Sequence, residues 1–79
     1  MKIERIQTGV RMEKRLVKVL KGTAEYLDMS LGDLLEGIVL HAFEGKKPVF
    51  SSETQTKIAA LKKIYDLDLD ASHSHKLSE

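Results

Sequence analysis

Residues 3–12 have the sequence Ile3-Glu4-Arg5-Ile6-Gln7-Thr8-Gly9-Val10-Arg11-Met12, and two kinds of side chain alternate along most of it. Successive side chains of a β-strand point to opposite faces, so even-numbered and odd-numbered positions separate. One face would carry Ile6, Thr8, Val10 and Met12, and the other would carry Arg5, Gln7, Gly9 and Arg11. The pattern predicts a half-buried strand over residues 3–12, weakened at Gly9, which has no side chain to pack.

The rest of the chain is predicted to be helical. Apolar residues recur at helical spacing in three segments, which we expect to be helices over residues 13–28, 31–44 and 52–65. Ser30 can cap the second helix and Gly45, followed by Pro48, ends it. The third helix can be capped at Ser51, whereas the usual capping residues Ser, Thr, Asp and Asn are missing at the start of the first.

A single copy of this chain does not complete its own core. The chain has 79 residues and no cysteine, and so small a domain usually needs a partner when disulfides are excluded. The one predicted strand needs another strand for its backbone N–H and C=O groups. We therefore expect a homodimer in which the strand pairs antiparallel with its own copy.

The second predicted helix supports the same conclusion. It is apolar around more than half of its circumference, so it must be buried on several sides. In a dimer it would pack against its symmetry mate. The residues expected in the dimer core are Val10, Met12, Leu35, Ile38 and Ala42.

Charge is strongly polarised along the chain, although the formal net charge is only +1. Residues 1–21 carry seven basic and two acidic side chains, residues 22–45 carry five acidic and no Lys or Arg, and residues 46–79 carry six basic and five acidic. The basic block over residues 1–21 favours an anionic partner. The alternative interpretation is that the basic and acidic blocks pair with each other inside one chain.

The order of strand, helix, short turn with an N-capping Ser and apolar helix resembles the ribbon-helix-helix family of Arc-type and MetJ-type repressors. The stretch from Gly9 to Leu16 is similar to the family's strand-to-helix junction. The stretch from Leu27 to Leu35 is similar to its turn into the second helix. The resemblance covers residues 4–44. It implies a ribbon-helix-helix unit over residues 1–45, followed by a C-terminal helix and polar tail over residues 46–79.

This resemblance implies a homodimeric DNA-binding protein, either a transcriptional repressor or an antitoxin-like regulator. Its paired strands would enter the major groove and read palindromic or repeated half-sites. The base-reading positions would be Arg5, Gln7, Gly9 and Arg11. Phosphates would be contacted by Lys14, Arg15, Ser30, Leu31 and Gly32. Two residues depart from the pattern, because Gly9 has no side chain to read with and Asp33 adds negative charge beside the phosphate site.

The alternative function is a protein-interaction or structural module that keeps the fold without reading DNA. Gly9, Asp33 and the near-neutral total charge favour it. The predicted helix over residues 52–65 adds a possible contact surface for a protein partner.

Catalytic, metal-binding and membrane functions are not expected. Asp66, Asp68 and Asp70 imitate the start of a calcium loop, but Ala71 and Leu77 stand where that loop needs Gly and Glu. His41 suits a helix C-terminus, and we expect His73 and His75 to be solvated. No nucleophile-and-base pair or phosphate-binding glycine loop is present, and we expect no cofactor. The longest apolar run is far too short to span a bilayer, so we expect a cytoplasmic protein.

Overall fold

The structure of the chain is a computed structural model that describes residues 3–45 and 49–70. These residues contain three helices, α1 (Lys14–Tyr26), α2 (Leu31–Glu44) and α3 (Ser52–Ile64). The prediction of a mainly helical fold with three helices is therefore confirmed. The bounds of α2 are as predicted, and α3 ends one residue earlier than predicted. α1 begins one residue later and ends two residues earlier than predicted.

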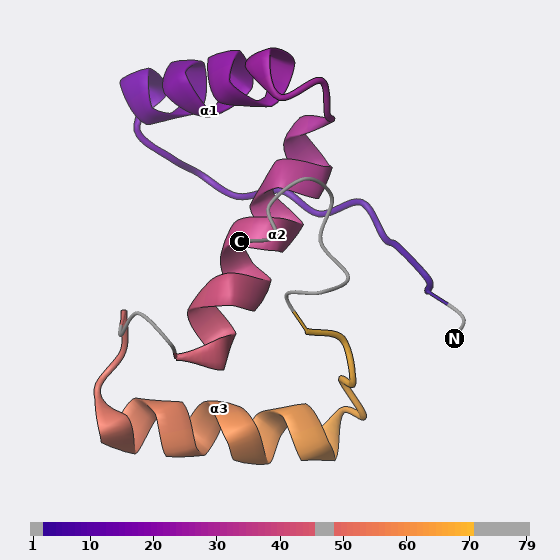
Figure 1. The fold of residues 1–79 in the computed structure, drawn as a ribbon, viewed down its shortest axis with the longest axis vertical. Helices are drawn as coiled ribbons and strands as arrows, with labels where there is room; N and C mark the ends of the chain where they lie inside the picture. The colour runs from indigo at the N-terminus through magenta and orange to yellow at the C-terminus, as the bar shows by residue number, and fades with distance from the viewer. Residues whose placement is uncertain (1–2, 46–48, 71–79) are drawn as a thin grey trace.

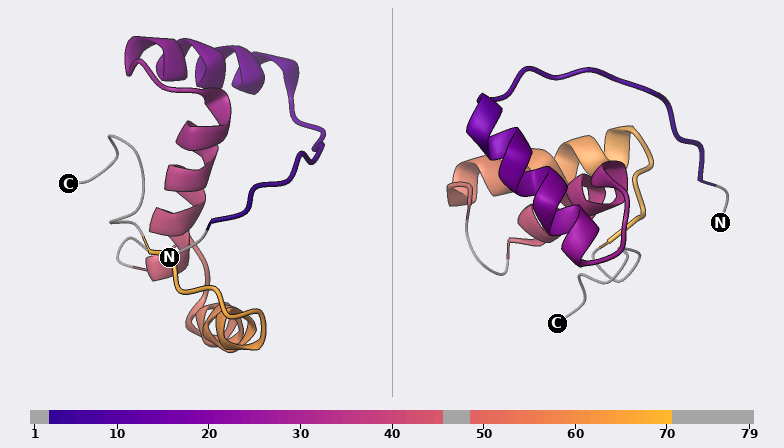
Figure 2. Two further views of the ribbon diagram at one scale, coloured as in Figure 1. Left: turned by 90° about the vertical axis from the view of Figure 1, so that its right-hand side faces the viewer. Right: turned by 90° about the horizontal axis from the view of Figure 1, so that it is seen from above.

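The three helices are arranged around α2. Figures 1 and 2 show α1 lying across the N-terminal end of α2 and α3 lying across its opposite end. The segment before α1 runs in an extended path past the middle of α2 (Figure 1). α2 is thus the element that connects the other parts of the molecule.

The segment before α1 belongs to no helix, and the described part of this single chain offers no strand for it to pair with. The strand predicted over residues 3–12 would pair with the same strand of a second chain. Both the strand and its pairing therefore stay predictions.

The N-terminus of each helix is capped by a side chain. The backbone N–H groups of Arg15 and Leu16 donate to Glu13 Oε1 at 2.8 and 3.1 Å, so a glutamate caps α1 in place of the expected capping residues. Ser30 Oγ accepts the N–H of Asp33 at 3.1 Å, as predicted for α2. Ser51 Oγ likewise accepts the N–H of Thr54 at the start of α3. These bonds satisfy donors that lack partners inside the helix.

The early end of α1 has a specific cause at Asp28. Asp28 has a φ of +57°, and its N–H donates to the carbonyl of Glu25 at 3.1 Å. The N–H of Met29 donates to the carbonyl of Ala24 at 3.0 Å. This pair of bonds is the Schellman motif, which closes a helix with a left-handed residue. Asp66, with a φ of +53°, closes α3 in the same way.

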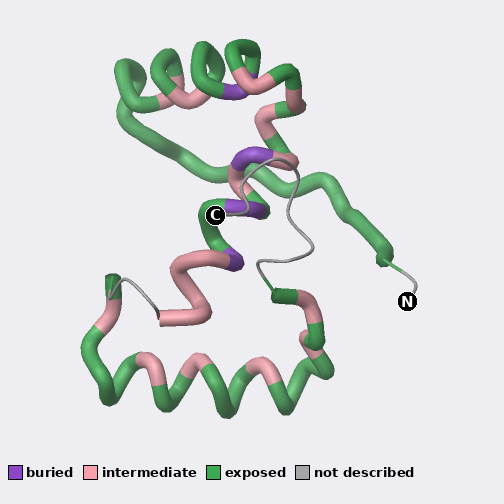
Figure 3. The backbone as a smooth tube through the Cα atoms, viewed as in Figure 1, coloured by how far each residue is buried: buried purple, intermediate pink, exposed green. Residues whose placement is uncertain are grey.

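Little apolar surface is buried among the residues that the structure describes. The buried hydrophobic residues among those described are Ala24, Leu34 and Leu40, and Gly37 is buried beside them on α2. Figure 3 shows these buried positions on α1 and along α2, from its first turn to beyond its middle. Thirteen large apolar side chains of the described residues remain exposed. The core therefore fixes α1 on α2 and leaves much apolar surface uncovered.

A separate set of contacts attaches α3 to the end of α2. The Nε2 group of Gln55 on α3 donates to the backbone carbonyl of Phe43, one of the carbonyls that a helix C-terminus leaves without an internal partner. The rings of Phe43 and Phe50 lie 6.5 Å apart, centre to centre. Gly45 ends α2 with a φ of +74°, as predicted. A Cβ atom at Gly45 would lie 3.0 Å from the Gln55 side chain.

We expect Asp28→Gly to stabilise the protein by about 0.5–1 kcal/mol, because glycine adopts a positive φ without the steric cost that a Cβ atom brings. The measurement is chemical denaturation monitored by circular dichroism. The matched control is Glu25→Gly, which places glycine at a helical position of α1 and should destabilise by about 1 kcal/mol. Destabilisation by both substitutions would contradict this account of the turn.

Candidate dimer face and nucleic-acid interface

α2 carries two neighbouring apolar faces that differ in burial. Leu34, Gly37 and Leu40 are spaced three residues apart and are buried inside the chain. The predicted dimer-core residues of α2 follow a second helical row. These residues are Leu35, Ile38 and Ala42. Ile38 remains 44 % exposed, and the other two are only partly buried. One face is thus used within the chain and the other lacks full cover.

The two predicted dimer-core residues outside α2 are also uncovered. Val10 is 70 % exposed and Met12 is 37 % exposed in the segment before α1. Ile6, on the same predicted strand face, is 87 % exposed. Apolar side chains from two elements therefore face solvent in a single copy of the chain, which is the condition that association relieves.

The four predicted base-reading residues all lie in the exposed segment before α1. Gln7, Gly9 and Arg11 are exposed. Arg5 differs, because its Nε and Nη2 atoms donate to the two carboxylate oxygens of Glu36 on α2, at 3.0 and 3.2 Å. The hydrogen bond and charge of Glu36, aided by the charge of Asp33, raise the pKa of Arg5 above its ordinary value. The segment before α1 (residues 3–13), which we call the arm, is thereby attached to α2 by a two-pronged ion pair.

This ion pair connects the basic arm with the acidic middle of the chain. The two residues are 31 positions apart, so the contact is tertiary. It is one instance of the pairing inside a chain that the charge pattern left as the alternative interpretation. The other basic residue of the base-reading row, Arg11, lies three positions before α1 and is exposed.

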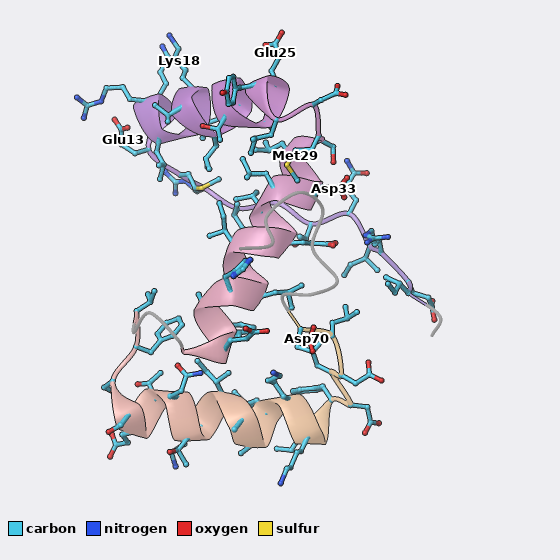
Figure 4. The ribbon with its side chains drawn as sticks, viewed as in Figure 1. Glu13, Lys18, Glu25, Met29, Asp33 and Asp70 are labelled. Atoms are coloured by element: carbon cyan, nitrogen blue, oxygen red, sulfur yellow. The ribbon has the colours of Figure 1, made fainter. Side chains whose placement is uncertain are left out.

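The predicted phosphate-contacting cations lie at the start of α1. Lys14 and Arg15 are both exposed, and Arg15 Nε donates to Glu13 Oε2 at 2.8 Å. Figure 4 shows Lys18 on the outer side of α1, pointing away from α2. A phosphate approaching this end of α1 would meet exposed cations and one capping carboxylate.

The second predicted phosphate position is the N-terminus of α2. Leu31 and Gly32 form its first turn, where backbone N–H groups lack partners inside the helix. A shallow groove at this turn is lined by Ser30 and Leu31 together with one cation and three carboxylates. The charged lining residues are Lys21, Glu25, Asp28 and Asp33. The structure thus places the predicted residues together, but the surrounding charge works against phosphate.

The remaining candidate residues from the sequence bear on metal binding or on a membrane span. Among residues 3–45 and 49–70, no group of three His, Cys, Asp or Glu side chains is arranged to hold a metal ion. Asp66 instead closes α3, and His73 and His75 lie outside the described residues. Within the same residues, none of the helices combines the length and the apolar character needed to cross a bilayer.

In comparisons with models of known families, with curated proteins and with solved structures, the chain has no significant match.

The sequence did not reveal the roles of three residues whose side chains hold parts of the structure together. Glu13 caps α1, Glu36 holds Arg5, and Gln55 binds the end of α2. Glu13 carried a partial signal, because an acidic residue at the start of a helix favours the helix dipole. The partner of Glu36 was not identifiable, because it comes from a distant segment without helical periodicity.

We expect the midpoint of thermal unfolding to rise with protein concentration, because the uncovered face of α2 and the exposed arm are buried only on association. Light scattering should give the mass of a dimer. The variant Ile38→Asp would bury an unpaired charge at the interface and should abolish the dimer.

Val19→Asp is the matched control, since Val19 is 65 % exposed on α1 and lies outside the predicted dimer core. It should keep the dimeric mass. A monomeric mass for the unmodified chain, with a midpoint independent of concentration, would contradict the assembly.

We expect the stability of the fold to fall as the pH is lowered through the range below about 4.5, the ordinary pKa of glutamate. Hydrogen bonds from the Arg15 side chain and from the backbone of Leu16 and Arg15 lower the pKa of Glu13. The contribution of this cap to folding stability is therefore complete above the ordinary pKa of glutamate. It is lost as the pH falls through the lowered pKa of Glu13 in the folded state.

The measurement is urea denaturation between pH 7 and pH 3. Glu13→Gln should reduce the loss of stability on acidification, because it removes the titrating cap. Glu4→Gln, the same change in an exposed glutamate of the arm, serves as the control. An unchanged pH dependence in Glu13→Gln would show that the cap does not contribute.

Proposed function

We propose that this chain is a homodimeric ribbon-helix-helix protein that binds DNA, acting as a transcriptional repressor or an antitoxin-like regulator. The observation that carries the proposal is the apolar row of α2 that lacks full cover, together with an exposed arm that carries Arg5 and Arg11. In the proposed dimer, the two arms pair as an antiparallel ribbon and the two α2 helices pack against each other.

Dimer formation would concentrate positive charge. Residues 1–21, which include the arm and the first part of α1, carry a formal charge of +5, so these segments of two copies together carry roughly twice that charge. Neutralising DNA phosphates with these positive charges releases counterions, which supplies binding free energy that falls with added salt. The exposed cations Lys14 and Arg15 at the start of α1 would flank the ribbon and contact phosphates.

Base reading would come from the outer face of the ribbon. Arginine can bind guanine through two hydrogen bonds and glutamine can bind adenine in the same way. Gln7 and Arg11 are exposed. They are four positions apart, so they would point to the same face of a strand. Gly9 between them would permit close approach of the backbone.

A second candidate function is a protein-interaction module with the same fold. The ion pair between Arg5 and Glu36 and the three carboxylates beside Ser30 favour it, because both reduce the positive charge available to DNA. The exposed apolar residues Leu61 and Ile64 of α3 would then contribute a contact surface.

The test is selection of duplexes from a random-sequence pool, followed by affinity measurements at several salt concentrations. We expect a palindromic or repeated half-site and a steep loss of affinity with salt. Arg11→Ala should cost about 1–3 kcal/mol on the selected duplex and relax its sequence preference. Lys14→Ala should weaken all duplexes similarly and lower the salt slope by about one unit.

Lys57→Ala on α3 is the matched control, because it removes one exposed positive charge away from the arm. It should leave both affinity and sequence preference close to those of the unmodified protein. If every duplex binds more weakly than about 0.1 mM near physiological salt, the DNA-binding proposal is wrong and the interaction module is favoured.

A further inference from the structure

The Arg5 guanidinium is held against α2 in the single chain and does not extend away from the helices. Its Nε and Nη2 atoms meet the two carboxylate oxygens of Glu36 at 3.0 and 3.2 Å. A base-reading arginine must instead extend from the outer face of the ribbon into the groove. One guanidinium cannot lie against α2 and reach a base edge on the opposite side of the arm.

The contact is strong in geometry but open to solvent. A two-pronged bond between a guanidinium and a carboxylate is among the better-oriented polar contacts in proteins. The two side chains nevertheless remain 51 % and 45 % exposed. Exposed ion pairs of this kind shift an equilibrium by about 1.5-fold to fivefold. The pair is therefore stable enough to be populated and weak enough for a base contact to displace it.

We propose that Glu36 competes with DNA for the Arg5 guanidinium and so limits how much of the sequence preference comes from Arg5. This inference rests on the proposed function. In the unbound protein, Glu36 holds Arg5 on α2. On a duplex with guanine at the matching position, Arg5 leaves Glu36 and binds the base, whereas on other duplexes the ion pair persists. Glu36 is thus a positioning residue that acts through Arg5.

A purely structural role for the pair predicts the opposite behaviour. If Glu36 served only to fasten the arm, its loss would loosen the arm and weaken binding to every duplex. If Glu36 competes with DNA, its loss releases Arg5 and strengthens binding, most of all on the preferred duplex. The ratio of affinities for preferred and scrambled duplexes therefore separates the two roles.

The experiment measures affinities of Glu36→Gln, Arg5→Ala and the double variant for the duplex selected above and for a scrambled duplex. Protein concentrations are kept above the dissociation constant of the dimer, measured for each variant by sedimentation. Glu4→Gln is the matched control, because it removes the same charge from the position next to Arg5. Any general gain from removing a negative charge near DNA appears in this control as well.

We expect Glu36→Gln to bind the selected duplex about two- to fivefold more tightly than Glu4→Gln, with a higher ratio of selected to scrambled affinity. This gain in affinity of Glu36→Gln over Glu4→Gln should disappear when Arg5→Ala is also present. Equal effects of Glu36→Gln and Glu4→Gln, a gain that survives in Arg5→Ala, or weaker binding by Glu36→Gln would each overturn the competition. Failure of the unmodified protein to bind any duplex would instead overturn the proposed function, and this inference with it.

Discussion

The shortage of buried apolar surface among the described residues of one chain constrains how the helices and the arm can be arranged. Ala24, Leu34 and Leu40 form a core that is large enough to position α1 on α2, but it covers only one of the two apolar faces of α2. Apolar surface left in water weakens the folded state, since burial is the main favourable contribution to folding. The proposed dimer would cover the face of α2 that carries Ile38, whereas within one chain the arm is held to α2 by the ion pair between Arg5 and Glu36.

Helix ends are fixed locally, by short-range bonds that do not depend on this core. Carboxylate and hydroxyl side chains cap the three N-termini, while Asp28 and Asp66 close α1 and α3 in left-handed conformations. Each element can thus be delimited by its own sequence before the elements pack. This division explains why a chain with so small a core still has well-defined helices and a sharp turn between α1 and α2.

The difference between locally fixed helix ends and contacts between distant residues also explains what the sequence could predict. The start and end of α2 followed from Ser30 and Gly45, whose local conformations are characteristic. The end of α1 was predicted too late, because Leu27 continues the apolar spacing while the left-handed turn at Asp28 overrides it. The tertiary contact between Arg5 and Glu36 was not predictable, since its partners are far apart in sequence and neither belongs to a repeating pattern. The site residues proposed from the ribbon-helix-helix resemblance, and their action on DNA, stay proposals, and the structure adds that Arg5 is held by Glu36 on α2.

Charge and apolar surface are connected through α2. This helix presents Ile38 on the face that lacks cover, and Glu36, two residues earlier, points toward the arm, as its bond to Arg5 shows. Residues two apart on a helix lie on different faces, so one element can contact a second copy and the arm at the same time. In the proposed dimer, two α2 helices would meet and their two arms would pair. Glu36 would then link the position of Arg5 to the same helix that forms the proposed interface.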